Sequence, residues 1–246
     1  MRKKQLNLFS ILILVLLSLF FFVWEHFFPS EQKSEAISEP TAQSIPQPKS
    51  KLKSIPANYD YVMANDSIGQ NKQAKTDYYT LVLSWSPAFC DSQRERYGKN
   101  LPTSMQLQCD TTQKFGWVIH GLWAQSKSAR RVSEHPRFCQ GDLPMLPSSV
   151  IEPYLAESPS AALLQAEWEK HGACAFRQAD QYFKKQQELY RTLTLPKQQF
   201  NSRNELFAWL KKNNPQLKNA YLGASRNELF ICYGLDWQVI DCPRNR

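Results

Sequence analysis

The chain has 246 residues, with 30 Lys and Arg against 22 Asp and Glu, a formal net charge of +8 and 13% aromatic residues. This composition excludes a collagen-like repeat and a wholly disordered chain, because there is enough apolar surface to form a core. The basic excess favours polyanionic partners, but many lysine-rich proteins share it. Charge alone therefore identifies no ligand.

Residues 1–28 predict a signal anchor. Basic residues at positions 2–4 precede an apolar run, Leu8–Trp24, which would form a helix about 25 Å long, close to the thickness of a bilayer core. The bulky stretch 20–24 lacks the small residues of a cleavage site. The positive-inside rule then places the chain after residue 30 across the membrane. Cleavage further along the chain is the alternative.

Residues 29–75 predict a stalk rather than a folded domain. Few apolar residues accompany the polar ones, so ordering the segment would cost entropy with little burial in return. Its prolines are Pro29, Pro40, Pro46, Pro48 and Pro56. Only residues 55–63, which include Tyr59 and Tyr61, suggest a short element that docks on the domain expected over 76–246.

The domain shows a mixed pattern of elements. Strands are expected over 78–85 and within 115–123, and a hairpin from 229–231 and 237–240. Helices are expected between 159 and 176, over 180–193, and over 202–212. Because these elements do not alternate strictly, we expect a single disulfide-bonded α+β domain, with a central antiparallel sheet packed against several helices.

Six cysteines lie in the part of the chain that would be translocated. An even number confined to this part is typical of disulfides in an oxidising compartment. Six thiols allow fifteen pairings, and zinc binding is a weaker alternative because no Cys-x-x-Cys spacing occurs. The close pair at the C-terminal end is expected to close the hairpin. The cysteines are Cys90, Cys109, Cys139, Cys174, Cys232 and Cys242.

Two short segments concentrate reactive side chains. His120 ends a predicted strand and His171 ends a predicted helix, and each precedes a glycine that would let a ligand approach closely. On that helix Glu167, Lys170 and His171 stand at i, i+3 and i+4, so they share one face. A plain structural interpretation is a surface ion pair and a helix cap. Two imidazoles in one pocket would instead transfer protons in both directions near neutral pH.

The two segments resemble the signature boxes of the ribonuclease T2 family, cyclising endoribonucleases that include bacterial periplasmic ribonuclease I. The first box, apolar-His-Gly-Leu-Trp-Pro, is matched by residues 119–123, with Ala124 where proline is usual. The second, His-Glu-Trp-x-Lys-His-Gly-x-Cys, is matched from Glu167 to Cys174. Residues 85–90 and the C-terminal hairpin also agree, so the resemblance spans about 77–243.

The resemblance implies an endoribonuclease that acts on single-stranded RNA without a metal or other cofactor. His171 would be the general base on the ribose 2′-OH, and His120 the general acid on the departing 5′-oxygen. Lys170 and Glu167 would stabilise charge on the phosphorane. The products would be a 2′,3′-cyclic phosphate and then a 3′-phosphate.

Two tryptophans are the candidate substrate-binding residues. Trp123 resembles the base-stacking residue of the family, although a core tryptophan is an equally plain interpretation, and Trp117 lies in the same predicted strand segment, two residues before the box. One departure concerns Ala166, which replaces the family's phosphate-binding histidine; losing that contact would weaken binding by about 1.5–3 kcal/mol. We expect a slower enzyme. The alternative is a catalytically weakened protein that binds RNA or another polyanion at the membrane surface, and a zinc hydrolase using both histidines is a distant third.

The N-terminal helix and the positive-inside rule predict a periplasmic domain anchored to the inner membrane, or secreted to the periplasm if that helix is cleaved. We expect a monomer. The family's cysteine pattern implies the disulfides Cys90–Cys109, Cys139–Cys174 and Cys232–Cys242.

Overall fold

The computed structural model describes residues 55–244. The predicted anchor over 1–28, and the predicted stalk as far as residue 54, lie outside the described residues. Among residues 55–244, no helix combines the length and apolar character needed to cross a membrane.

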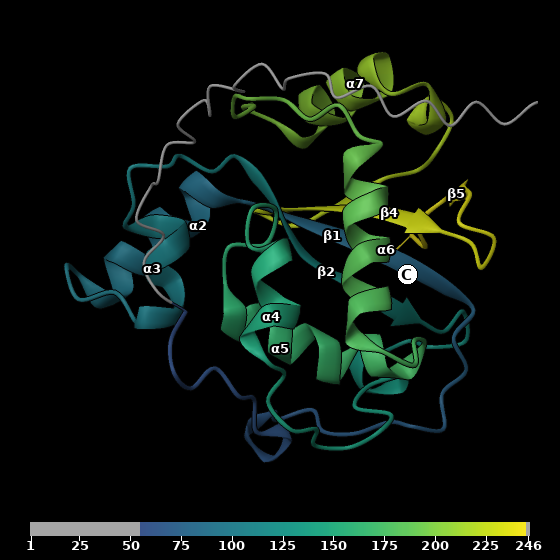
Figure 1. The fold of residues 1–246 in the computed structure, drawn as a ribbon. Helices are drawn as coiled ribbons and strands as arrows, with labels where there is room; N and C mark the ends of the chain where they lie inside the picture. The colour runs from purple at the N-terminus through teal and green to yellow at the C-terminus, as the bar shows by residue number, and fades with distance from the viewer. Residues whose placement is uncertain (1–54, 245–246) are drawn as a thin grey trace, which may run out of the picture. The chain divides into compact units, whose positions relative to one another are not determined.

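The centre of the domain is a five-stranded antiparallel sheet with the order β2-β1-β4-β3, and β5 pairs with β4 at the end of the hairpin (Figure 1). The middle strand, β1, is almost completely buried, which its apolar and aromatic composition explains. The strands are β1 Tyr78–Trp85, β2 Trp117–Gln125, β3 Gly223–Ala224, β4 Glu228–Tyr233 and β5 Val239–Ile240.

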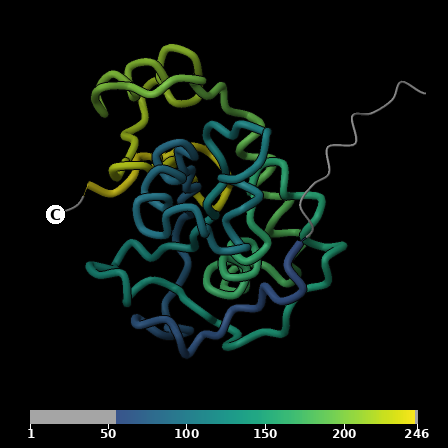
Figure 2. The backbone as a smooth tube through the Cα atoms, turned by 90° about the vertical axis from the view of Figure 1, so that its left-hand side faces the viewer, coloured from purple at the N-terminus to yellow at the C-terminus, as the bar shows by residue number. Residues whose placement is uncertain are grey.

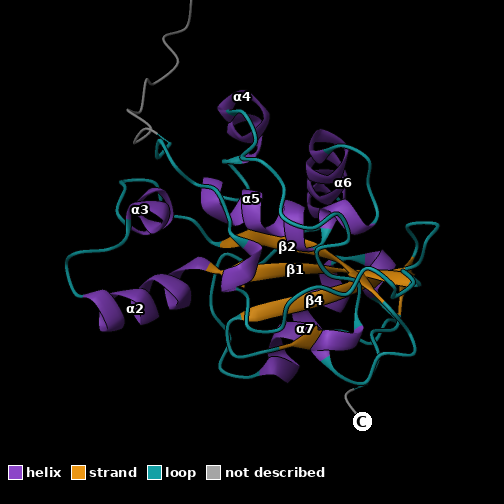
Figure 3. Cartoon of the chain, turned by 90° about the horizontal axis from the view of Figure 1, so that it is seen from below, coloured by secondary structure: helices purple, strands orange, loops and turns teal. Residues whose placement is uncertain are grey.

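Helices cover this sheet. Helices α5 and α6 lie over β1 and β2, and α7 lies on the β4 side, away from α4 and α5 (Figures 1 and 3). The α-helices are α2 Ser86–Tyr97, α3 Thr103–Cys109, α4 Ser148–Ile151, α5 Ala161–Lys170, α6 Ala179–Arg191 and α7 Arg203–Asn213. The 3-10 helices are η1 Met63–Asn65, η2 Val132–Glu134, η3 Glu152–Tyr154, η4 Gly172–Cys174 and η5 Pro215–Leu217.

The expected α+β fold is confirmed: strands β1 and β2 and helices α5, α6 and α7 lie where the sequence pattern predicts them, whereas α2 was not expected. The fully buried Tyr182 and Phe183 of α6 pack with Leu81 and Leu83 of β1 in one core cluster. The Tyr182 hydroxyl also accepts a hydrogen bond of 3.0 Å from the backbone N–H of Leu122, which ties α6 to β2. The core therefore fixes β2, the strand that carries the first histidine.

All six cysteines are paired as the family resemblance implies. Cys90–Cys109 joins α2 to α3, and Cys232–Cys242 closes the β4–β5 hairpin. Cys139–Cys174 joins the loop after β2 to η4, which directly follows α5. This last disulfide holds two segments next to the candidate site.

The segment 55–76, which includes the C-terminal part of the predicted stalk, packs on the domain. Tyr59 is 5% exposed, and its hydroxyl donates to the carbonyl of Leu146. Asn71 forms a two-way backbone bridge with Arg137. Figure 2 shows the segment running beside the loops that follow β2. Burial of its few aromatic side chains and pairing of its polar groups offset the entropy cost that favoured a stalk.

Candidate active site

Both candidate histidines are held by well-fixed elements, but His120 lies within β2 and not at the strand end that the sequence predicts. His120 lies on β2, and His171 is the C-cap residue of α5, whose N-terminus is capped by the Ser160 hydroxyl. Helix α5 contacts β2 directly. A Cβ at position 121 would collide with the Glu167 carboxylate, so Gly121 is what lets α5 approach the strand.

The Glu167 carboxylate is the centre of the site. This side chain is buried, and its Oε1 lies 3.4 Å from Nε2 of His120. Its Oε2 accepts a 2.7 Å hydrogen bond from Nε1 of Trp123. On the other side of the ring, Nδ1 of His120 lies 2.7 Å from Oε1 of Glu228 at the start of β4. Each ring nitrogen of His120 therefore faces a carboxylate oxygen.

This arrangement favours the charged form of His120. Burial on its own would lower the pKa of His120, but the Glu167 and Glu228 carboxylates raise it to about 10. Burial would likewise raise the pKa of Glu167, but its histidine neighbours and the Trp123 hydrogen bond bring that pKa below its ordinary value. At neutral pH the site contains an imidazolium held between two carboxylates.

His171 is in the opposite state. Its burial lowers its pKa to about 3, a shift that Glu167 opposes and that the nearby charges of Lys170 and Arg137 reinforce. Its Nδ1 is buried and has no hydrogen-bond partner among the described residues. The indole of Trp123 stacks on the His171 ring at 5.3 Å and meets the His120 ring edge-on at 5.5 Å. A neutral and a protonated imidazole thus share one tryptophan neighbour.

The shared helix face predicted for Glu167, Lys170 and His171 is only partly seen. Glu167 points to His120, whereas the ammonium of Lys170 lies 2.7 Å from Oδ2 of Asp66, in the segment before β1. The other oxygen of Asp66 lies 2.8 Å from the guanidinium of Arg137. Sequence reasoning missed Asp66, Arg137 and Glu228; only Glu228 carried a signal, as an acidic residue directly before a predicted strand.

Trp117 lies at the far end of β2, away from Trp123. It packs against Trp85 at 5.4 Å and lines a cavity of about 300 Å³, bounded by residues 198–203 and 224–228. Glu228 lines the same cavity and also contacts His120, so it joins the cavity to the histidine pair.

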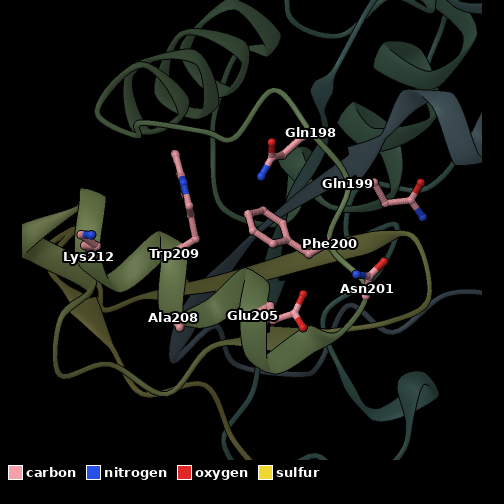
Figure 4. A pocket seen from close by; sticks show the side chains of 8 residues that line it. All are labelled: Gln198, Gln199, Phe200, Asn201, Glu205, Ala208, Trp209 and Lys212. Carbon is pink, nitrogen blue, oxygen red and sulfur yellow. The ribbon is translucent and has the colours of Figure 1, made fainter.

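A larger cavity of about 480 Å³ lies on the other side of residues 198–201, where Figure 4 shows Phe200 beside Trp209. None of the predicted catalytic residues lines it. Although this cavity has the larger volume, the candidate site is the one around His120, because the two histidines and the buried carboxylate lie together there. Within the described chain, no group of three or more His, Cys, Asp or Glu side chains is placed to hold a metal ion.

The fold and the site together define a disulfide-bonded α+β protein with two histidines beside one buried carboxylate. A model of the Ribonuclease T2 family matches residues 76–229. A "Probable ribonuclease" of Haemophilus influenzae is 50% identical, and the match covers 98% of each chain. "Ribonuclease 1" of Arabidopsis thaliana is 29% identical over 69% of each chain. The chain therefore belongs to the ribonuclease T2 family.

Solved structures agree with the fold. An RNase-related protein from Calystegia sepium matches with a TM-score of 0.51 at 18% identity, and the match covers 71% of this chain and 94% of that one. Trichomaglin, described as an S-like ribonuclease, matches with a TM-score of 0.50 at 20% identity and covers 69% and 92%. At this identity the likeness concerns the fold alone.

Proposed function

We propose that this ribonuclease cleaves single-stranded RNA by transphosphorylation, without a metal or other cofactor. The observation that carries the proposal is the arrangement of two histidines around one tryptophan and one buried carboxylate, with Nε2 of His120 3.4 Å from Oε1 of Glu167 and the Trp123 ring in contact with both imidazoles. The pKa of His120 is about 10 and that of His171 about 3, so at neutral pH one holds a proton and the other can accept one.

In the first step, neutral His171 takes the proton of the ribose 2′-OH, and the oxygen attacks the adjacent phosphorus. The P–O5′ bond breaks as His120 gives its proton to the departing oxygen, which leaves a 2′,3′-cyclic phosphate. In the second step, water attacks the cyclic phosphate with the two roles exchanged, which gives a 3′-phosphate and restores both histidines.

The other site residues support these transfers. Glu167 holds His120 protonated and oriented, and Lys170 supplies positive charge for the phosphorane oxygens. A base of low pKa is weak, but a bound phosphodiester places negative charge near His171 and raises the pKa of its imidazole in the complex. The cavity beside Trp117 and Glu228 would receive a nucleotide next to the scissile phosphate, with Trp123 at the phosphate itself.

The proposal is tested by incubating the full chain with single-stranded RNA in EDTA. We expect cyclic-phosphate and 3′-phosphate products, and no cleavage of the matching 2′-deoxy strand, which lacks the nucleophile. His120→Ala and His171→Ala should each slow cleavage by about 10²–10⁴-fold. Absence of cyclic-phosphate products at every pH from 4 to 8 would favour the second candidate, an RNA-binding protein, which Ala166 supports by removing a phosphate contact.

The location of the domain is also a proposal. We infer that residues 1–28 anchor a monomeric periplasmic enzyme to the inner membrane, or that a cleaved signal releases it to the periplasm. The mass of the mature protein distinguishes the two, since cleavage removes the apolar run Leu8–Trp24.

A further inference from the structure

An acidic residue from outside the matched family region enters the site. The family model begins at residue 76, yet Asp66 reaches the catalytic helix. Its side chain is 7% exposed, with Oδ2 2.7 Å from the Lys170 ammonium and Oδ1 2.8 Å from the Arg137 guanidinium. Oδ1 also accepts hydrogen bonds from two backbone N–H groups of the following turn, at 3.0 and 3.1 Å. The carboxylate is therefore fully engaged and fixed in place.

The loop after η2 links the segment containing Asp66 to the end of α5. Arg137 pairs with Asn71 through two backbone hydrogen bonds of 2.9 and 3.1 Å. The next residue, Phe138, donates its backbone N–H to the Lys170 carbonyl at 3.0 Å, and Cys139 is joined to Cys174. Three consecutive residues of one loop thus connect the segment, the catalytic lysine and the turn after His171.

A lysine needs such support to act at a defined point. Its ammonium is carried on a flexible four-carbon stem and has three N–H donors. One donor faces Asp66, which leaves two for phosphate oxygens, and the Lys170 side chain remains 24% exposed. Arg137 shares the charge of the carboxylate, so Asp66 orients Lys170 without cancelling the positive charge of the pair.

We propose that Asp66 is a positioning residue, which acts by holding the Lys170 ammonium where the phosphorane forms. The inference rests on the proposed transphosphorylation and deepens it. It predicts a specific kinetic signature, because Asp66→Asn removes one negative charge beside the phosphate site and also frees the lysine stem. Ground-state binding of the anion should become tighter while turnover becomes slower.

The test is a double-mutant cycle in the full chain with Asp66→Asn, Lys170→Gln and the double variant. We expect Asp66→Asn to lower kcat about tenfold or more, with KM unchanged or lower. In the Lys170→Gln background the same change should alter kcat less than about twofold, because the lysine is no longer there to position. An equal loss of kcat in both backgrounds, or no loss in either, would overturn the inference.

Two further variants are included, one as a control and one as a substitute for Asp66→Asn. Asp60→Asn, an exposed carboxylate in the same segment, is the control and should leave kcat and KM unchanged. If Asp66→Asn does not fold because Arg137 loses its counter-charge, Asp66→Glu takes its place in the cycle; it keeps the charge but displaces the oxygens.

A binding measurement separates this inference from the proposed function. The affinity for inorganic phosphate, measured by calorimetry, should rise several-fold in Asp66→Asn, and by less when the same change is made in Lys170→Gln, because only a lysine released from Asp66 can turn its ammonium to the phosphate. If the wild-type chain makes no cyclic phosphate, the proposed function fails. The role of Asp66 is then decided by the phosphate affinities of the wild type, the two single variants and the double variant alone. The same change in affinity in both backgrounds would count against it.

Discussion

Replacing Glu228 by glutamine tests how the charge of His120 is maintained. Glu228 and Glu167 together raise the pKa of His120 from its ordinary 6.5 to about 10. One neighbouring opposite charge typically accounts for about 1–3 pKa units. Glu228 is the more exposed of the two carboxylates, 24% against 6%, so its share should be the smaller one. Glu228→Gln should therefore bring the pKa of His120 to roughly 8–9.

The assay is kcat/KM for a dinucleotide substrate, measured from initial rates between pH 5 and 10.5 with the uncatalysed rate subtracted. In the variant, the pKa that defines the basic limb of the profile should fall from about 10 to roughly 8–9, while kcat/KM near pH 6 stays close to the wild-type value. The limb moves down because deprotonated His120 has no proton for the leaving oxygen.

The matched control is Glu188→Gln, which removes a carboxylate paired with Lys185 on α6. Its profile should coincide with that of the wild type. If the basic limb stays at its wild-type position in Glu228→Gln, either His120 does not control that limb or Glu228 does not influence it, and the reasoning from the 2.7 Å contact is refuted.

Four further outcomes follow from the same geometry. The raised pKa of His120 contributes stability that is complete below pH 6.5 and is lost as pH rises through about 10, so thermal melts of His120→Ala should show a flatter decline over that range. The lowered pKa of His171 costs stability as pH falls from 6.5 toward about 3, and His171→Ala should remove that loss. Gly121→Ala should abolish cleavage because its methyl would displace the buried carboxylate, as single-turnover assays would show. The double Cys139→Ser and Cys174→Ser variant should lose about 3–4 kcal/mol in urea unfolding, from opening a loop with a sequence separation of 35.

Local patterns in the sequence were sufficient for most of the fold. The helix expected over 202–212 is α7, and Ser202 caps its N-terminus, because the Ser202 hydroxyl accepts a hydrogen bond from the backbone N–H of Glu205. The apolar spacing along 180–193 becomes the buried face of α6. Helix α2 was not expected, although Pro87 stands at its first turn, where proline is tolerated. Helix α2 was missed because its apolar residues do not recur at helical spacing along the sequence.

The site was less predictable because its contacts are set by tertiary register. His120 and Glu228 are 108 residues apart and meet because β1 pairs with both β2 and β4, which places Ser84 opposite Glu228. No spacing in the sequence encodes that alignment. The pattern i, i+3, i+4 around Glu167 was correct as far as the helix goes, but α5 ends at Lys170. The Lys170 ammonium instead pairs with Asp66, which lies in the segment before β1.

The charges of the site clarify what the net charge of +8 does and does not explain. The ion pairs of the candidate site join three basic and three acidic side chains, whose charges cancel when His120 is protonated; they are His120, Lys170, Arg137, Asp66, Glu167 and Glu228. A phosphodiester therefore meets no net positive charge there, and its stabilisation depends on the direction of individual donors. In the proposed mechanism, the histidine usual at the position of Ala166 would add a cation, so without it the placement of Lys170 would carry more of the phosphate contact. The basic excess elsewhere on the chain would attract RNA, whereas turnover would depend on how firmly this balanced group of side chains is held.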